Sequence, residues 1–433
     1  MSLVNKIVRK LAHSQALIGV KDRIGRRLRE TYYNAEVLLR IQDKITPLIV
    51  EVDANAPVRI NLLLPEIDFR TFYGGYIAKF NLAQKLTDAG YLVRFVIVDP
   101  CDIDEAAWRK GVAQYDGLEN IFDRVEYSHV YDRKNTLTVS PNDKVIATTW
   151  WTAYIANSLA QDLNIDRFLY LIQEYEPFTF PMGSYYAIAH ESYSFPHKAM
   201  FSSPQLQQYF EQSKIGIYSD SKWCKPTESM PFENAILAYE QSDLIKDRTA
   251  GSHKLLFYAR PEAHAARNMF EVAYLALSKA IEQGAFDEGK WEFHGIGSSH
   301  GDIPLPKGHT LKMIGKFGLK EYKARLLNYD LGLSLMYTPH PSLLPLEMAA
   351  AGMWVVTSAC ENKTAAVLSN ISSNLIGSEA TIDGVAKGLG YTAGQVGDID
   401  ARKEGANVQW AANWDDAFSK QKMNQIINWL ELS

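Results

Sequence analysis

From Val58 onward, short apolar runs alternate with longer stretches in which apolar residues recur at helical spacing. Short runs of this kind are typical of strands, and the longer stretches are typical of the helices that connect parallel strands. The alternation therefore predicts a β-α-β series with a parallel sheet. Its predicted elements are strands at 58–65, 91–99, 143–151 and 167–175, and a helix at 76–89.

A second series of the same kind begins at His253 and predicts another parallel sheet. Its strands are expected at 253–260, 291–297, 309–315, 329–337 and 353–359, with helices from about Asn268 and through 346–352. The polar stretch 240–252 lacks apolar periodicity, which suits a linker between domains. We therefore expect an α/β protein with two Rossmann-like domains and a cleft between them. The expected parts are a basic helical arm over 1–50, domains over 51–245 and 246–413, and a C-terminal helix over 414–433 that crosses back to the first domain.

The N-terminal arm combines a helical apolar spacing with an excess of Lys and Arg over residues 1–30. Two interpretations are open. The helix could pack on the body with its basic face in water, or it could dock on an anionic membrane surface.

Composition excludes several classes of protein. A net charge of -5 gives no overall attraction for nucleic acid. Cys101, Cys224 and Cys360 are too few and too far apart for a disulfide framework or a zinc pattern. No apolar run approaches the roughly 18 residues of a membrane span. A secretory signal has an uninterrupted apolar core, whereas Lys6, Arg9 and Lys10 interrupt the start of this chain. We expect a cytoplasmic protein, with the inner face of the membrane as a possible peripheral site.

Gly74 and Gly75 lie between the first predicted strand and the following helix. Backbone approaches a ligand closely at glycine, and free N–H groups at a helix start can hold a phosphate. A tight turn that needs positive φ would explain the pair equally well. Because the first β-α loop lies at the usual ligand edge of a doubly wound sheet, we favour a binding role.

Arg260 ends the first strand of the second series and should emerge at the corresponding edge, with Arg267 in the same loop. Two guanidinium groups there suit bidentate recognition of phosphate and neutralisation of a leaving diphosphate. A surface arginine held in a salt bridge is the alternative for each.

Glu347 is the only charged residue between Pro341 and Cys360. An unpaired buried carboxylate would cost several kcal/mol, so it should find hydrogen-bond donors such as sugar hydroxyls, or else backbone amides or an arginine. Ser342 could cap the helix, which would leave the N–H groups near Leu343 and Leu344 free for a phosphate.

These residues resemble the donor site of retaining glycosyltransferases of the GT-B fold, family 4. The resemblance equates Gly74-Gly75 with the family's glycine-rich loop, Arg260 and Arg267 with its basic pair, and Glu347 with the acid that binds the nucleotide ribose. It further implies that Gly315, Lys316 and Phe317 wall the base and that Gln173 and Glu174 lie on the acceptor or sugar side, although Glu174 could equally form an unrelated salt bridge. The family's second acid is replaced by Pro339, beside His340, which suggests a sugar recognised differently, such as a deoxy sugar.

The stretches over 174–210 and 258–277 resemble more narrowly the WsaF-type rhamnosyltransferases. That resemblance implies transfer of L-rhamnose from dTDP-L-rhamnose to a growing, possibly lipid-linked bacterial surface glycan, such as that of an S-layer, with retention of configuration. It names no catalytic base. A UDP-hexose donor and a non-catalytic glycan-binding scaffold are the alternatives.

Two acidic strings, Asp102 to Asp104 and Asp398 to Asp400, could in principle hold a divalent cation. Such strings are common by chance, and the arginine pair already supplies positive charge. We therefore expect neither a metal nor a cofactor, and treat the nucleotide sugar as a substrate.

Overall fold

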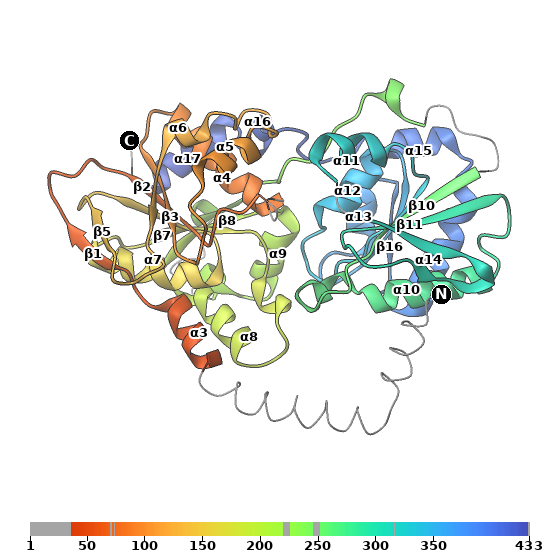
Figure 1. The fold of residues 1–433 in the computed structure, drawn as a ribbon, viewed down its shortest axis with the longest axis horizontal. Helices are drawn as coiled ribbons and strands as arrows, with labels where there is room; N and C mark the ends of the chain where they lie inside the picture. The colour runs from red at the N-terminus through yellow and green to blue at the C-terminus, as the bar shows by residue number, and fades with distance from the viewer. Residues whose placement is uncertain are drawn as a thin grey trace, which may run out of the picture. The chain divides into compact units, whose positions relative to one another are not determined.

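The computed structural model describes residues 36–69, 72, 74–219, 226–245, 252–315 and 317–431 (Figure 1). The chain divides into two compact units, Met1–Pro47 and Leu48–Ser433. The described part of the first unit contains helix α3 (Glu36–Ile45). The basic stretch predicted over residues 1–30 lies outside the described residues, and so does Lys316.

The first sheet of the second unit has seven parallel strands. The strands in the middle of this sheet are mainly apolar because helices cover both of its faces. Four of the seven lie within the stretches predicted from the sequence. In spatial order the strands are β4 (Val125–His129), β3 (Val93–Ile97), β2 (Ile60–Leu64), β6 (Lys144–Ala147), β7 (Phe168–Ile172), β8 (His197–Phe201) and β9 (Ser229–Pro231).

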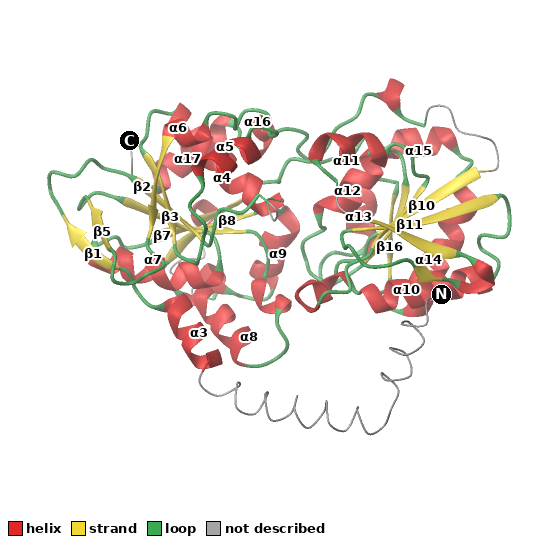
Figure 2. Ribbon diagram, viewed as in Figure 1, coloured by secondary structure: helices red, strands yellow, loops and turns green. Residues whose placement is uncertain are grey.

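Side chains alternate between the faces of this sheet, so each strand serves two layers of core. Leu62 and Leu64 pack on the side of α4, whereas Leu63 packs on the side of α7. Helices lie on both faces, as Figure 2 shows. One layer contains α4 (Gly74–Asp88), α5 (Glu105–Val112) and α6 (Ile121–Arg124), and the other contains α7 (Trp150–Asp162) and α9 (Pro204–Gln212).

Smaller elements complete this half of the unit. They are β1 (Ile49–Val52) paired in parallel with β5 (Thr136–Val139), the helix α8 (Ser184–Glu191), and short 3-10 turns that include η1 (Glu176–Thr179).

The second sheet also has seven strands, six of them parallel and one antiparallel at the edge. In spatial order they are β12 (Ile303–Pro304), β13 (Thr310–Gly315), β11 (Lys290–Ile296), β10 (Ser252–Tyr258), β14 (Leu331–Leu333), β15 (Trp354–Ser358) and β16 (Leu375–Ser378). The five strands predicted for the second series all occur. The predicted fold class, two parallel-sheet α/β domains, is confirmed.

The second sheet is covered in the same way. Leu255 and Phe257 pack against one helical layer, and Leu256 between them packs against the other. The first layer contains α10 (Phe270–Glu282) and α14 (Ile382–Gln395), and the second contains α11 (Leu319–Leu326), α12 (Leu343–Ala350) and α13 (Ala365–Ile371). Helix α15 (Ile399–Gly405) follows α14.

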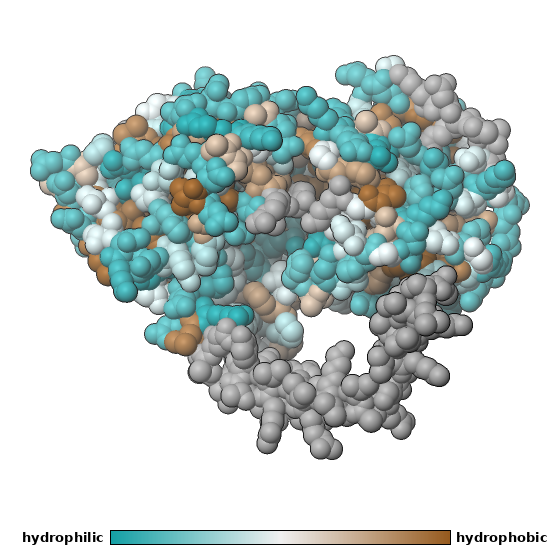
Figure 3. Space-filling view, in the orientation of Figure 1, coloured by the Kyte–Doolittle hydropathy of each residue, from teal (hydrophilic) through white to brown (hydrophobic). Residues whose placement is uncertain are grey.

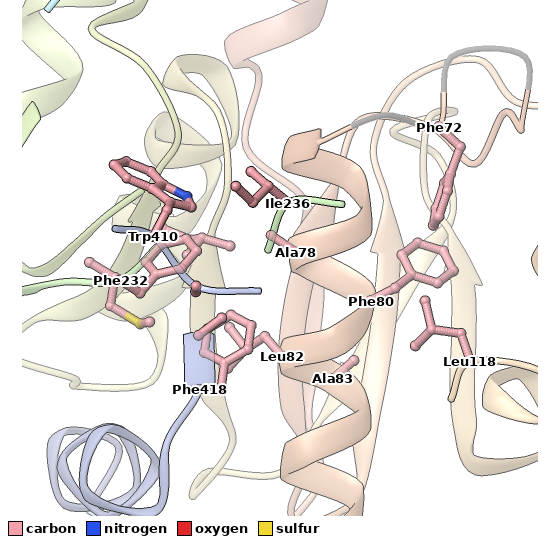
Figure 4. Close-up of a cluster of buried hydrophobic side chains, with 14 of the residues drawn as sticks. Phe72, Ala78, Phe80, Leu82, Ala83, Leu118, Phe232, Ile236, Trp410 and Phe418 are labelled. Carbon is pink, nitrogen blue, oxygen red and sulfur yellow. The ribbon is translucent and has the colours of Figure 1, made fainter. Parts of the chain in front are cut away.

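The end of the chain packs against the first sheet and its helices. Helices α16 (Trp414–Ala417) and α17 (Lys420–Trp429) follow Trp410, whose indole N–H donates to the Asn234 carbonyl (2.9 Å). Phe418 stacks on Phe232, with ring centroids 5.2 Å apart. Figure 4 shows the resulting core: Ala78 and Leu82 of α4 face Ile236, Trp410 and Phe418, and Phe80 on the other side of α4 faces Phe72 and Leu118. Helix α4 is therefore buried on two sides.

None of the described helices combines the length and the apolar character that crossing a bilayer requires. The face drawn in Figure 3 is mainly hydrophilic, with apolar side chains scattered over it.

Candidate donor and acceptor site

The predicted site residues lie where the strand order of each sheet reverses direction. In the first sheet this point falls between β2 and β6, and in the second it falls between β10 and β14. Ligands of open α/β sheets bind at such switch points, beyond the carboxyl ends of the strands. The loop before Gly74 follows β2, and the loop from Arg260 to Arg267 follows β10. The loop that ends at Ser342 follows β14 and lies beside it, because the Tyr337 N–H donates to the Arg267 carbonyl (2.8 Å).

The glycine pair is a point of close approach between the two sheets' loops. A Cβ on Gly74 would lie 3.1 Å from Leu343 Cδ1 of α12, and a Cβ on Gly75 would lie 3.2 Å from Gln173 Cγ. Both distances are tighter than ordinary van der Waals contact. Four predicted residues, Gly74, Gly75, Gln173 and Leu343, are thus brought together from three segments.

Gln173 and Glu174 follow β7 at the same edge. The Asn234 side-chain amide donates to Gln173 Oε1 (2.9 Å), but Gln173 Nε2 has no hydrogen-bond partner and no exposure to solvent. Glu174 Oε2 is likewise enclosed and unpartnered. No ion pair involves Glu174 within the described ranges, so the salt-bridge alternative gains no support there. Both side chains therefore have an enclosed polar atom that could still form a hydrogen bond.

The start of α12 differs from the predicted cap. Ser342 occupies the N-cap position, but its side chain makes no capping hydrogen bond, so that prediction was wrong. Its backbone has φ +67°, a left-handed conformation that is rare for a residue with a Cβ. The cause is His340, whose Nδ1 accepts the Ser342 N–H (2.9 Å). In the described structure no side chain caps the first turn of α12, which leaves the Leu343 and Leu344 N–H groups for an anion.

His340 joins the two sheets. Since its Nδ1 accepts a hydrogen bond, its Nε2 carries the proton and donates to the Ser202 carbonyl (3.3 Å) at the end of β8. Burial lowers the pKa of His340, which keeps the ring neutral. The buried ammonium of Lys363 donates to the Met336 carbonyl (2.6 Å) and to the His340 carbonyl (3.4 Å). These contacts fix the loop before α12.

Glu347 has two donors in the structure. The Tyr322 hydroxyl donates to Oε2 (2.7 Å), and the Leu237 backbone N–H also bonds the carboxylate. Desolvation raises the pKa of Glu347 to about 7, although both hydrogen bonds lower it in part. No cation forms an ion pair with it among the residues described. Because a carboxylate has about four acceptor positions, Glu347 can accept further hydrogen bonds from a ligand.

Arg260 forms a salt bridge with Glu262, as the alternative interpretation of this residue expected. Its Nε donates to Glu262 Oε2 (3.0 Å), Nη1 donates to the Tyr258 hydroxyl (3.2 Å), and Nη2 lies 2.8 Å from His264 Nε2. Glu262 also accepts a hydrogen bond from Ser298. Although desolvation alone would raise it, the bonds from Ser298 and Arg260 lower the pKa of Glu262 to about 2. An ionised Glu262 therefore orients Arg260.

Arg267 has spare donors. Its Nη1 reaches the His264 carbonyl (3.4 Å), whereas its Nε is enclosed without a partner. The turn that carries Arg267 contacts η1, which follows Glu174 in the first half of the unit. Arg267 is thus the cation of the pair that faces the first sheet.

The predicted base wall is partly described. Gly315 has φ +77°, and a Cβ there would meet no atom within 4 Å. The Gly315 carbonyl accepts the Gly297 N–H (3.4 Å), and a Cβ on Gly297 would lie 2.7 Å from Arg260 Cδ. The ring of Phe317 lies 4.2 Å from the Arg325 guanidinium. The ends of β11 and β13 thus lie beside Arg260.

The acidic strings have structural roles at their ends. Asp104 accepts the Ala107 N–H at the start of α5, and Asp398 accepts the Ala401 N–H at the start of α15, each at 3.0 Å. Both residues are N-caps.

Two charged residues at the site were not predicted. Lys79 is 3% exposed and lies one helical turn after Gly75. Glu176 begins η1, two residues after Glu174. The helical spacing from Gly75 could have identified Lys79, because positions four apart share one face of a helix.

Comparison with known proteins places these features in a family. The family model described as the N-terminal domain of WsaF matches residues 59–203, and that of the WsaF C-terminal domain matches residues 253–390. Together the two matches span more than half of the chain. A curated relative, the O-antigen biosynthesis protein RfbC of Myxococcus xanthus, is 27% identical over 256 residues, which are 56% of this chain and 17% of RfbC.

Solved glycosyltransferase structures share the fold. HepE of Anabaena, solved with UDP and glucose, has a TM-score of 0.56 at 14% identity, over 86% of this chain and 98% of its own. WaaG, a glycosyltransferase involved in lipopolysaccharide biosynthesis, has a TM-score of 0.51 at 13% identity, over 85% and 99%. At these identities the likeness establishes the fold alone, which is GT-B. With both of its domains matched by the family models, the chain belongs to the WsaF family of GT-B glycosyltransferases.

Proposed function

We propose that this protein transfers a sugar from a nucleotide-diphosphate donor to a growing bacterial surface glycan. The observation that carries the proposal is the uncapped first turn of α12, which meets Gly74 of the opposite loop. The donor diphosphate would accept hydrogen bonds from the Leu343 and Leu344 N–H groups at the positive end of the helix dipole.

Arg260 and Arg267 would stabilise the negative charge that develops on the departing diphosphate. Arg260 is preorganised by the ionised Glu262, so little reorganisation accompanies binding. Arg267 has an unpartnered donor on the side of the first sheet. A charge held in place before the reaction lowers the barrier more than one that must move.

We further propose L-rhamnose as the transferred sugar, from dTDP-L-rhamnose and with retention of configuration. Membership in the WsaF family supports this donor, as does Pro339 in place of an acid that would contact sugar hydroxyls. The HepE complex with UDP and glucose makes a UDP-hexose the alternative donor. The acceptor would be a glycan, either free or lipid-linked, and the basic residues before Glu30 would give peripheral contact with an anionic membrane.

Replacing Glu347 with Gln is expected to weaken donor binding by about 1–3 kcal/mol, because a neutral amide replaces an ionised acceptor of the ribose hydroxyls. The folded-state pKa of Glu347, about 7, lies above its ordinary 4.5, so ionisation costs stability as pH rises from 4.5 through 7. At pH 8 the variant should therefore melt no lower than the wild type. Calorimetric titration with dTDP and UDP, and melting temperatures at pH 5 and 8, measure both effects on one preparation.

Glu233→Gln is the matched control, because Glu233 is also a desolvated carboxylate that accepts a backbone N–H, from Ala411 at 2.9 Å. It should leave nucleotide affinity unchanged. Normal affinity of Glu347→Gln together with a lowered melting temperature at pH 8 would assign Glu347 to the fold instead of the ribose.

A further inference from the structure

Four charged side chains face one another at the carboxyl edge of the first sheet, two of each sign. Glu176 lies within electrostatic reach of Lys79, Glu174 and Arg267. None of the four forms an ion pair with another in the described part of the chain. A polar ligand could supply the hydrogen-bond partners that these side chains lack.

Lys79 is the most enclosed of the four. It projects from α4 one turn after Gly75 and is 3% exposed. Its ammonium lies 4.3 Å from the centroid of the Tyr76 ring, a cation–π contact that offsets only part of the cost of burial. No described group accepts a hydrogen bond from its Nζ. Burial lowers the pKa of Lys79 to about 8, and Glu176 opposes that shift, so the side chain remains largely charged at neutral pH.

Glu176 is fixed opposite this cation. Its Oε2 accepts the Trp150 N–H at the start of α7. The Tyr193 hydroxyl accepts the Glu176 N–H and donates to the Glu174 carbonyl, each at 3.1 Å. The turn that carries both carboxylates is therefore rigid, and Glu176 cannot swing toward Lys79 without breaking these contacts.

Glu174 and Arg267, the other two charged residues, also have atoms without hydrogen-bond partners. Glu174 Oε2 and Arg267 Nε are enclosed atoms without hydrogen bonds, and Gln173 Nε2 beside them is a third. Buried polar atoms of this kind are rare in folded proteins, and a cluster of them suggests a bound group that supplies the missing partners.

The signs of these four charges indicate which class of ligand would fit between them. Lys79 and Arg267 would attract an anion, whereas Glu174 would repel it, and so would Glu176 in its ionised form, because burial raises the pKa of Glu176 to about 7. A sugar hydroxyl suits both signs, because it donates to a carboxylate and accepts from an ammonium or guanidinium group. Lys79, Glu174 and Glu176 also lie in the first half of the unit, whereas the proposed phosphate contacts lie at α12 and in the loop of Arg260 and Arg267.

We propose that Lys79 and Glu176 form a subsite for a neutral sugar of the acceptor, binding adjacent hydroxyls of its ring. This rests on the proposed function, since it takes the sugar bound there to be the acceptor. Glu174 and Gln173 line the side of the subsite nearest α12 and bind the remaining hydroxyls, while Arg267 lies between this subsite and the donor diphosphate.

The test measures sugar binding without turnover. Neutral methyl glycosides of L-rhamnose, D-glucose, D-galactose and D-mannose, with methyl glucuronide as the charged comparison, are titrated by ligand-observed NMR against the protein saturated with dTDP or UDP. The variants are Lys79→Met and Glu176→Gln. Their controls are Lys198→Met, whose Nζ bonds the Trp429 carbonyl (3.1 Å), and Glu233→Gln. Nucleotide affinity and melting temperature are measured on every variant.

At least one neutral glycoside should bind the wild type and both controls, and lose at least tenfold in affinity with either variant. Nucleotide affinity should change less than twofold, and the melting temperature should not fall. The proposal is overturned if no neutral glycoside binds the wild type, if the glucuronide binds best, or if the variants lose stability while they bind sugar normally. Failure of the proposed function would appear separately, as sugar binding without transfer.

Discussion

Replacing Arg402 with Met is expected to destabilise the fold by about 3–5 kcal/mol, since it leaves a buried carboxylate without its main cation. Arg402 and Asp330 are 1% and 2% exposed, and Arg402 Nη1 donates to Asp330 Oδ1 (3.0 Å). The same guanidinium donates to the Gly352 carbonyl (2.8 Å) and the Val396 carbonyl (2.9 Å). It therefore ties the start of β14 to the end of α12, the two elements that carry the proposed donor loop.

Urea and thermal unfolding of the variant measure this loss. Arg109→Met is the control, because the Arg109 pair with Asp123 (2.6 Å) is 41% and 58% exposed. An exposed pair contributes about 1 kcal/mol or less. If the two variants were destabilised equally, the buried network would have no special role in holding α12.

Replacing Arg260 with Ala is expected to weaken dTDP or UDP binding by about 1.5–3 kcal/mol, the value of a charge-assisted hydrogen bond to phosphate. That is roughly a 10- to 150-fold rise in Kd. Glu262 keeps its hydrogen bond from Ser298, so the variant should stay folded.

Thymidine and uridine, which lack the phosphates, make this test specific. Arg260→Ala should bind them as the wild type does and lose affinity only for the diphosphates. Arg124→Ala, which removes a surface partner of Asp88 (2.6 Å), is the control and should change neither. Equal weakening of nucleoside and nucleotide would place Arg260 away from the diphosphate.

The sequence predicted strands such as β2 and β3 because their runs are mainly apolar, although β2 contains Asn61 and β3 contains Arg94. It did not predict β4 or β8, whose residues VEYSH and HKAMF mix polar and apolar positions. In β8, His197 bonds the Phe195 carbonyl only two residues away (2.7 Å), whereas Lys198 donates to the distant Trp429 carbonyl (3.1 Å). Tertiary contacts of this kind leave no local pattern.

The site was predictable to the extent that strand ends place residues at one edge of a sheet. That rule placed Gly74 and Arg260 in loops at the switch points, and Gln173 at the end of β7, which neighbours β6. It did not reveal which residues of other segments lie beside them, such as Glu176 near Lys79 or Tyr322 bonded to Glu347. The expected Ser342 cap is absent, and the contacts around it are again tertiary: the Ser342 N–H donates to the His340 ring, which in turn donates to the Ser202 carbonyl at the end of β8.

The central claim is transfer from a nucleotide sugar, and a donor panel tests it most directly. The purified chain would be incubated with a synthetic rhamnoside-terminated acceptor and, in turn, dTDP-L-rhamnose, UDP-glucose, UDP-galactose and GDP-mannose, with the product measured by mass spectrometry. The account predicts a single addition of a deoxyhexose from dTDP-L-rhamnose, with the anomeric configuration of the donor retained in the product. Transfer only from a UDP-hexose would contradict the proposed donor, and nucleotide binding with no transfer from any donor would contradict the enzymatic function itself.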